Sequence, residues 1–273
     1  MHRFAKFAAG SFLTILAAGE ARSEDRCAVG PVHPAAVNAT SLTSLSWTPF
    51  RRPELGWEVY APLIGEEIAV DCPPGSPGFA AGLATWQKKH LLPATGVMDP
   101  ATFQRMEDMW ELKRPFVIAS RHACPPAPDE STLVKAAPAE SYGGKQILLR
   151  PEALEAYRRL VAAARASVPA LTADRRLLTI FSGYRNPDSD DARCQRDNNC
   201  QGIVRASCSA HRTGTAMDFY LGAAPGFAVD SSDDANRLYL SRTPAYLWLV
   251  HNAEGFGFLN YPFEPWHWEW KGN

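Results

Sequence analysis

The stretch Ser209-Ala-His211-Arg-Thr-Gly214-Thr-Ala-Met-Asp218 decides how the C-terminal half of this 273-residue chain should fold. Gly214 and the β-branched threonines on either side of it disfavour a continuous helix. The pattern instead predicts a turn that leads into a strand, so that a loop histidine and a strand aspartate can converge. Imidazole and carboxylate groups are both good zinc ligands. Taken alone, a histidine and an aspartate at this spacing remain a weak signal.

A second stretch, Glu264-Pro-Trp-His267, lies near the C-terminus. His211, Asp218 and His267 together would give zinc three protein ligands and leave a fourth position for water, which is the layout of a catalytic site. The proline after Glu264 favours an extended backbone at that residue. A carboxylate placed there could take a proton from the water and pass it to a leaving amine. The two stretches therefore predict a metallohydrolase.

The composition is that of a folded protein with room for two modest domains, with 46% hydrophobic and 21% charged residues. The net charge of -1 gives no indication of a nucleic-acid partner. Residues 1–21 have the basic start, short apolar run and small residues of a secretory signal peptide, with an uncleaved anchor as the alternative. We therefore expect a secreted, periplasmic or cell-wall-associated monomer with no membrane span after signal removal.

The chain contains six cysteines, and an even number in an exported protein favours disulfide bonds. Six cysteines allow fifteen pairings. The alternative is a zinc site built from the last three, but their spacing is not that of a zinc knuckle. Loop length suggests Cys194 with Cys200, and position near the N-terminus suggests Cys27 with Cys72, which leaves Cys124 with Cys208.

Two helices joined by a tight turn are predicted between Phe79 and Lys113. Phe79, Leu83 and Trp86 recur at helical spacing. After the turn, Asp99 is a good N-cap and the proline that follows it suits the first helical position.

Residues 50–113 resemble the small three-helix peptidoglycan-binding domain. The resemblance rests on the aromatic-Gln pair Trp86-Gln87, the turn Gly96-Val97-Met-Asp99 and the pair Thr102-Phe103. It implies that residues 22–115 form a helical module that binds peptidoglycan. An ordinary helical hairpin is the alternative, since caps and aromatic stripes are common and such aromatics are usually core residues.

Residues 116–140 are rich in proline and alanine, which is typical of a linker. Beyond them, short strands are predicted at 146–149, 177–181, 215–221 and 267–270. Helices are predicted from Pro151 and over 244–254. This mixture predicts an α+β domain over residues 141–273.

Three motifs in residues 140–273 resemble, in their order, the zinc D-alanyl-D-alanine carboxypeptidases of the VanY type. They are Ser182-Gly-Tyr-Arg185, the stretch from Ser209 to Asp218, and Glu264-Pro-Trp-His267. The resemblance implies a zinc peptidase domain with a small antiparallel sheet flanked by helices. It also implies one Zn²⁺ per chain on His211, Asp218 and His267, with Glu264 as general base and Arg185 stabilising the charge on the scissile carbonyl oxygen. Substrate contacts are expected from Ser182, Tyr184, Ser209 and Trp266.

Several alternatives stay open at this point. Glu269 could replace Glu264 as the base. Two departures from the family pattern, an insertion over 188–207 and a short link between Tyr261 and Glu264, affect the expected substrate pocket. The predicted activity is removal of the terminal D-alanine from peptidoglycan stem peptides. An endopeptidase that cuts cross-links and a non-catalytic wall-binding protein are the alternatives, and the sequence does not distinguish D,D from L,D specificity.

Overall fold

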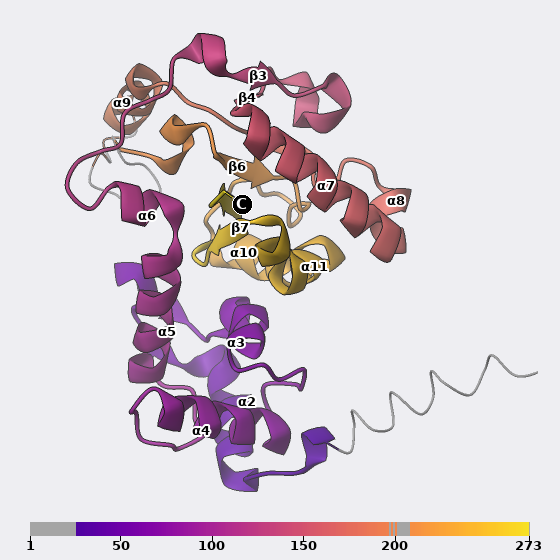
Figure 1. Cartoon of the computed structure of the whole chain (residues 1–273). Coiled ribbons are helices and arrows are strands. Elements are labelled where there is room, and N and C mark those ends of the chain that lie inside the picture. Colours follow the sequence, from indigo (N-terminus) through magenta and orange to yellow (C-terminus); the bar gives the residue numbers. More distant parts are fainter. Residues whose placement is uncertain (1–25, 197, 199, 201–207, 273) are drawn as a thin grey trace, which may run out of the picture. The chain divides into compact units, whose positions relative to one another are not determined.

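The computed structural model of the chain describes residues 26–196, 198, 200 and 208–272 (Figure 1). The predicted signal peptide lies outside the described residues. So do residues 197, 199 and 201–207 of the predicted insertion. Contacts divide the chain into two compact units, one of residues up to Leu42 with Ile68–Met98 and one of Thr43–Glu67 with Asp99–Asn273. No helix in the described part of the chain is long and apolar enough to cross a membrane.

The first unit is built around helix α4 (Pro77–Lys89) and most of α2 (Val32–Ser44). Helix α4 begins where Ser76 accepts a hydrogen bond from the backbone of Phe79, as an N-cap should. The predicted apolar stripe of Phe79, Leu83 and Trp86 is buried. Helix α2 was not expected, because its polar residues show little helical periodicity.

The turn after α4 is held by two buried amide side chains. Asn38 donates to the carbonyl of Gly96 and accepts from the amide of Met98, both at 2.8 Å. Gln87 accepts from the amide of Gly96 at 2.8 Å and donates to the carbonyl of Val97 at 3.0 Å. Gly96 has a φ of +69° and a Cβ there would lie 2.6 Å from the carbonyl oxygen of Ala80, so this turn requires glycine.

The second unit contains the remaining helices and the sheets. Helix α5 begins at the predicted N-cap, where the side chain of Asp99 accepts from the amide of Thr102. The helices are α3 (Ala61–Glu67), α5 (Pro100–Lys113), α6 (Pro115–Ala119), α7 (Pro151–Ser167), α8 (Pro169–Ala173), α9 (Pro187–Arg196), α10 (Asp234–Ser241) and α11 (Pro244–Asn252). Two short antiparallel pairs join β1 (Ser46–Trp47) to β2 (Glu54–Leu55) and β3 (Val134–Lys135) to β4 (Leu148–Leu149).

A four-stranded antiparallel sheet lies at the centre of this unit, in the order β5-β6-β8-β7. Its strands are β5 (Ile180–Ser182), β6 (Ala216–Phe219), β7 (Phe258–Tyr261) and β8 (Glu264–Trp270). Met217 is paired with Trp268, and both side chains belong to the buried core. Because side chains alternate along a strand, the residues on either side of this pair face the opposite way. This small antiparallel sheet with helices confirms the predicted α+β class.

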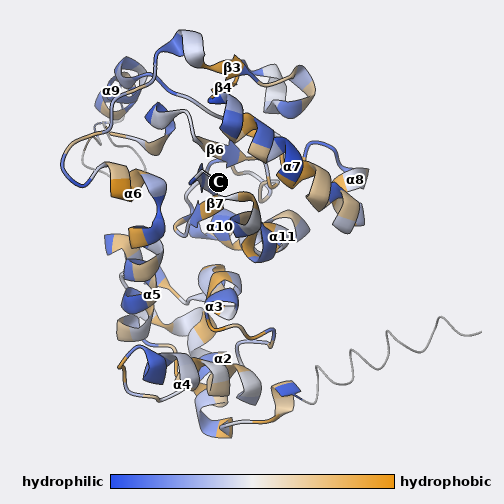
Figure 2. Cartoon of the chain, viewed as in Figure 1, coloured by the Kyte–Doolittle hydropathy of each residue, from blue (hydrophilic) through white to orange (hydrophobic). Residues whose placement is uncertain are grey.

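Helices α7 and α11 supply much of the core that covers the sheet. Figure 2 shows hydrophilic and hydrophobic residues side by side along α7, and the buried residues of this helix include Leu154, Tyr157 and Leu160. They belong to one apolar cluster with Phe219 of β6 and Tyr246 of α11. The apolar face of the sheet is buried against these helices, which holds the sheet in place, and the polar side chains lie on its opposite face.

All six cysteines form disulfides, in the predicted pairs Cys27–Cys72, Cys124–Cys208 and Cys194–Cys200. The alternative of a zinc site on the last three cysteines is therefore wrong, because none of the three is a free thiol. The domain boundaries predicted at 115 and 140 remain predictions.

Candidate active site

Three neighbouring strands carry polar residues side by side on one face of the sheet. Asp218 of β6 lies directly opposite Ser182 of β5 on one side and opposite His267 of β8 on the other. Directly opposed residues in antiparallel strands point to the same face, so the pairing itself brings the three side chains together. His267 Nδ1 lies 2.9 Å from Asp218 Oδ1.

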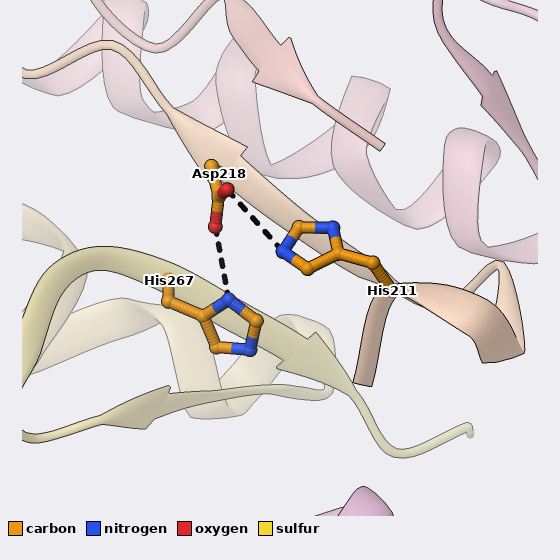
Figure 3. Close-up of side chains that lie close together, drawn as sticks. All are labelled: His211, Asp218 and His267. Atoms are coloured by element: carbon orange, nitrogen blue, oxygen red, sulfur yellow. Dashed lines mark hydrogen bonds and ion pairs between the residues drawn. The ribbon is translucent and has the colours of Figure 1, made fainter. Parts of the chain in front are cut away.

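His211 reaches the same point from the turn before β6. This turn is a short 3₁₀ helix, Ala210–Thr213, that begins where Ser209 accepts from the amide of His211. It ends at Gly214, whose φ of +71° is favoured by glycine. Figure 3 shows the result: the rings of His211 and His267 meet at the carboxylate of Asp218, with His211 Nε2 3.2 Å from Asp218 Oδ2.

The protonation of His211 fits a bound cation. His211 Nδ1 lies 2.7 Å from the carbonyl oxygen of Gly183, which can only accept, so Nδ1 carries the proton. Burial and the nearby Arg185 lower the pKa of His211 to about 4, which makes the ring neutral at pH 7. The lone pair of His211 Nε2 then faces the lone pairs of the Asp218 carboxylate, and a metal ion between them would turn this repulsion into two bonds.

The donor set matches zinc as well. One ligand atom from each of His211, Asp218 and His267 lies within 4.8 Å of the others, and all three residues are buried. Burial would raise the pKa of Asp218, but the cationic forms of the two histidines, and at neutral pH that of His267, outweigh burial and hold that pKa well below its usual range. The carboxylate is therefore ionised and able to ligate a cation at neutral pH. Two imidazoles and one carboxylate form a known type of catalytic zinc site.

Glu264 is the first residue of β8 and lines the same pocket as the three candidate ligands. Its side chain is partly buried, and burial is the main cause that raises its pKa to about 7. A carboxyl group with a pKa near the working pH can both take up and release a proton, which suits a general base that also returns the proton.

Arg185 is held in a fixed orientation by three side chains. Its Nε donates to Asp190 Oδ1 at 3.0 Å, Nη1 to the hydroxyl of Ser182 at 2.9 Å and Nη2 to that of Ser209 at 3.0 Å. A guanidinium has five N–H groups, so these three bonds leave about two for a substrate oxygen. Asp190 is a buried residue of α9, in the predicted insertion, and no sequence pattern indicates that it orients Arg185.

A pocket of about 340 Å³ surrounds these groups. Of the predicted substrate contacts, Ser182, Ser209 and Trp266 line it, and Tyr184 is not among its lining residues. Trp266 is almost fully buried, so it offers little surface to a ligand. Cys194 and Cys208 also line the pocket, which places two disulfides at its wall.

Glu269, the alternative base, is engaged elsewhere. Both of its carboxylate oxygens accept hydrogen bonds, Oε1 from Arg114 and Oε2 from the backbone amide of Phe116. Burial would raise the pKa of Glu269, but Arg114 and His267 outweigh burial and bring it to about 2. A carboxylate this acidic is a poor proton acceptor at neutral pH, which favours Glu264 as the base.

The comparisons with known proteins bear on the C-terminal part of the chain. No match to this chain is found among curated proteins. Residues 146–273 match the family model VanY, described as D-alanyl-D-alanine carboxypeptidase, and this range contains all three motifs and every candidate ligand. The match does not extend to residues 50–113, whose resemblance to a peptidoglycan-binding domain stays a prediction. Residues 146–273 therefore form a peptidase domain of the VanY family.

Proposed function

We propose that this protein is an exported zinc metallopeptidase that removes the terminal D-alanine from peptidoglycan stem peptides. The observation that carries the proposal is the convergence of His211, Asp218 and His267 on one point, inside a domain of a D-alanyl-D-alanine carboxypeptidase family. Three disulfides support export, since such bonds persist in oxidising compartments. Peptidoglycan is the partner that the family implies.

His211 Nε2, an oxygen of Asp218 and His267 Nδ1 would hold the zinc ion. When bound, zinc would act as a Lewis acid and lower the pKa of a water molecule. One carboxylate oxygen of Glu264 accepts the proton of the attacking water and later gives it to the leaving amine. The water oxygen bonds to the carbonyl carbon and the carbon–nitrogen bond breaks, so the products are D-alanine and the shortened peptide.

Arg185 stabilises the negative charge that develops on the scissile carbonyl oxygen. Its orientation is set in advance by Ser182, Asp190 and Ser209, so little reorganisation is needed during the reaction. Lys145 lines the same pocket, and a cation there suits a substrate that ends in a free carboxylate.

Digestion of purified muropeptides followed by mass spectrometry tests the proposal. Loss of a single terminal D-alanine is expected, whereas cleavage of cross-linked dimers would show an endopeptidase instead. The variant Glu264→Gln should keep one zinc per chain by atomic absorption and lose activity by about 10²- to 10⁴-fold, because the proton acceptor is gone. Retained activity in this variant would exclude Glu264 as the base, and inactive wild-type protein that still sediments with peptidoglycan would indicate a wall-binding protein.

Treatment with a chelator provides a second check. Wild-type activity should disappear and return on addition of Zn²⁺, while His211→Ala should bind no zinc at all. Full zinc content in His211→Ala would contradict the ligand assignment.

A further inference from the structure

Glu269 lies two residues after His267 on β8 and faces the same way. Its cross-strand partner is Ala216, and that of His267 is Asp218, so both side chains lie on the polar face of the sheet. The Glu269 side chain is only 2% exposed, and Oε1 lies 3.5 Å from Nε2 of His267. A buried carboxylate therefore stands at the far side of the imidazole whose Nδ1 is directed to Asp218.

Arg114 holds this carboxylate in place from a distant part of the chain. The residue follows the last turn of α5, and its Nε donates to Glu269 Oε1 at 2.9 Å. Its Nη1 donates to both carboxylate oxygens of Glu111, at 2.9 and 2.8 Å. The guanidinium also lies over the ring of Tyr261, with Cζ 4.1 Å from the ring centroid. The amide of Phe116 completes the arrangement by donating to Glu269 Oε2 at 2.8 Å.

The chemistry of a ligating histidine indicates what this arrangement does. If Nδ1 of His267 binds a metal, the ring proton must sit on Nε2, and a buried N–H needs an acceptor. Ligating histidines usually donate this second N–H to a carboxylate or carbonyl, which fixes the tautomer and the ring orientation. Gly183 fills that role for His211 with its carbonyl oxygen. His267 Nε2 is buried and makes no hydrogen bond to the described residues, and Glu269 Oε1, 3.5 Å away, is the carboxylate oxygen placed to accept from it.

We propose that Glu269 and Arg114 are positioning residues that orient His267 for metal binding, so that residues 111–117 belong to the active site. The inference rests on the proposed zinc site. It extends the functional unit upstream of residues 146–273, the range that matches the peptidase family. Glu111, Arg114, Phe116 and Val117 also line the pocket, so the same segment forms part of its wall.

The alternative is that Arg114 and Glu269 form a buried ion pair with a structural role only. A purely structural pair would lower the stability of the fold when it is broken and leave zinc affinity unchanged once the protein is folded. Zinc affinity, measured on folded protein, is therefore the readout that separates the two roles.

The experiment measures the dissociation constant of Zn²⁺ by competition with a chromophoric chelator, on full-length apoprotein checked for folding by circular dichroism. Glu269→Leu, which removes the acceptor, and Arg114→Met should each weaken zinc binding by about 10- to 100-fold, the usual effect of losing such an outer-shell partner. Arg114→Lys keeps the charge but not the planar fork, so an intermediate loss is expected. Leu154→Ala, in the buried face of α7, is the control for destabilisation and should bind zinc like wild type.

The outcomes separate the two proposals. If wild-type protein binds no zinc, the proposed function fails and this inference fails with it. If wild type binds zinc and the Glu269 and Arg114 variants bind it equally well, the inference alone is overturned. An equal loss of affinity in Leu154→Ala would likewise overturn it, because the effect would then follow from stability.

Discussion

Arg237 of α10 offers a quantitative test of how the start of strand β8, beside Glu264, is held. The side chain is fully buried, and its Nε donates to the carbonyl oxygen of Phe263 at 2.8 Å. Its Nη1 donates to Glu54 Oε1 at 2.8 Å, and its Nη2 to the hydroxyl of Tyr60 at 2.6 Å. Replacing Arg237 with methionine removes these bonds, together with the 3.3 Å bond from Nη1 to Asp234 Oδ1, and keeps much of the apolar volume.

The expected cost follows from what the substitution leaves behind. The side chain of Glu54 is only 4% exposed, so its carboxylate would remain buried without its counter-charge. Removing one partner of a buried ion pair costs about 3–5 kcal/mol, mostly through this uncompensated charge. With an m value of about 3 kcal/mol per molar urea, the unfolding midpoint should fall by about 1 to 1.7 M.

Urea unfolding followed by tryptophan fluorescence measures this loss, because Trp266 and Trp268 lie on β8 in the core. Arg242→Met is the matched control: its partner is Glu58, and its side chain is 60% exposed, so the cost should stay below about 1 kcal/mol.

Two results would contradict this prediction. The first is an Arg237→Met variant that is no less stable than Arg242→Met. The second is a failure of Glu54→Gln to restore part of the stability in the Arg237→Met background, since removal of the stranded charge should relieve most of the penalty.

Two further predictions concern the pocket. Arg185→Ala should lower the turnover rate on muropeptides by about 10²- to 10³-fold at unchanged zinc content. Arg185→Lys should recover little of this rate, because lysine cannot reproduce the fork held by Ser182 and Ser209. A wild-type rate in either variant would show that Arg185 does not act in the reaction. Replacing both cysteines of Cys124–Cys208 by serine should destabilise the fold more than replacing those of Cys194–Cys200, because the sequence separations are 84 and 6. Loop-closure entropy predicts that the free energy of unfolding falls by about 4.6 kcal/mol without Cys124–Cys208 and by about 2.4 kcal/mol without Cys194–Cys200. Equal losses in denaturant titrations would contradict this prediction.

The convergence of the candidate metal ligands could be expected from the sequence because the motifs that carry the family resemblance are local. His211, Gly214 and Asp218 lie within one turn and one strand, and the glycine signals where the turn ends. His267 falls in a strand of alternating character, so its face follows from simple periodicity. Once both strands were expected, a single antiparallel pairing of Asp218 with His267 was enough to bring the ligands together.

The groups that support these ligands could not be predicted in the same way. Arg114 contacts Glu269 across 155 residues, and Arg237 contacts Glu54 across 183. No periodicity or spacing links residues so far apart, and an arginine beside a helix end is usually a solvent-exposed cation. The role of Asp190 could not be predicted for a related reason, since this residue lies in an acidic helix start that suggests a surface loop.

These distant contacts act on the two ends of the same strand. Arg237 binds the carbonyl of Phe263, the residue before Glu264, while Arg114 binds Glu269, two residues beyond His267. Strand β8 carries both the proposed base and a proposed ligand, and small displacements of such groups cost large factors in rate. The partners that hold it, Glu54 and Tyr60 for Arg237 and the 111–117 segment for Glu269, all precede residue 146. The unit that positions this strand is therefore longer than the peptidase domain that carries its chemistry.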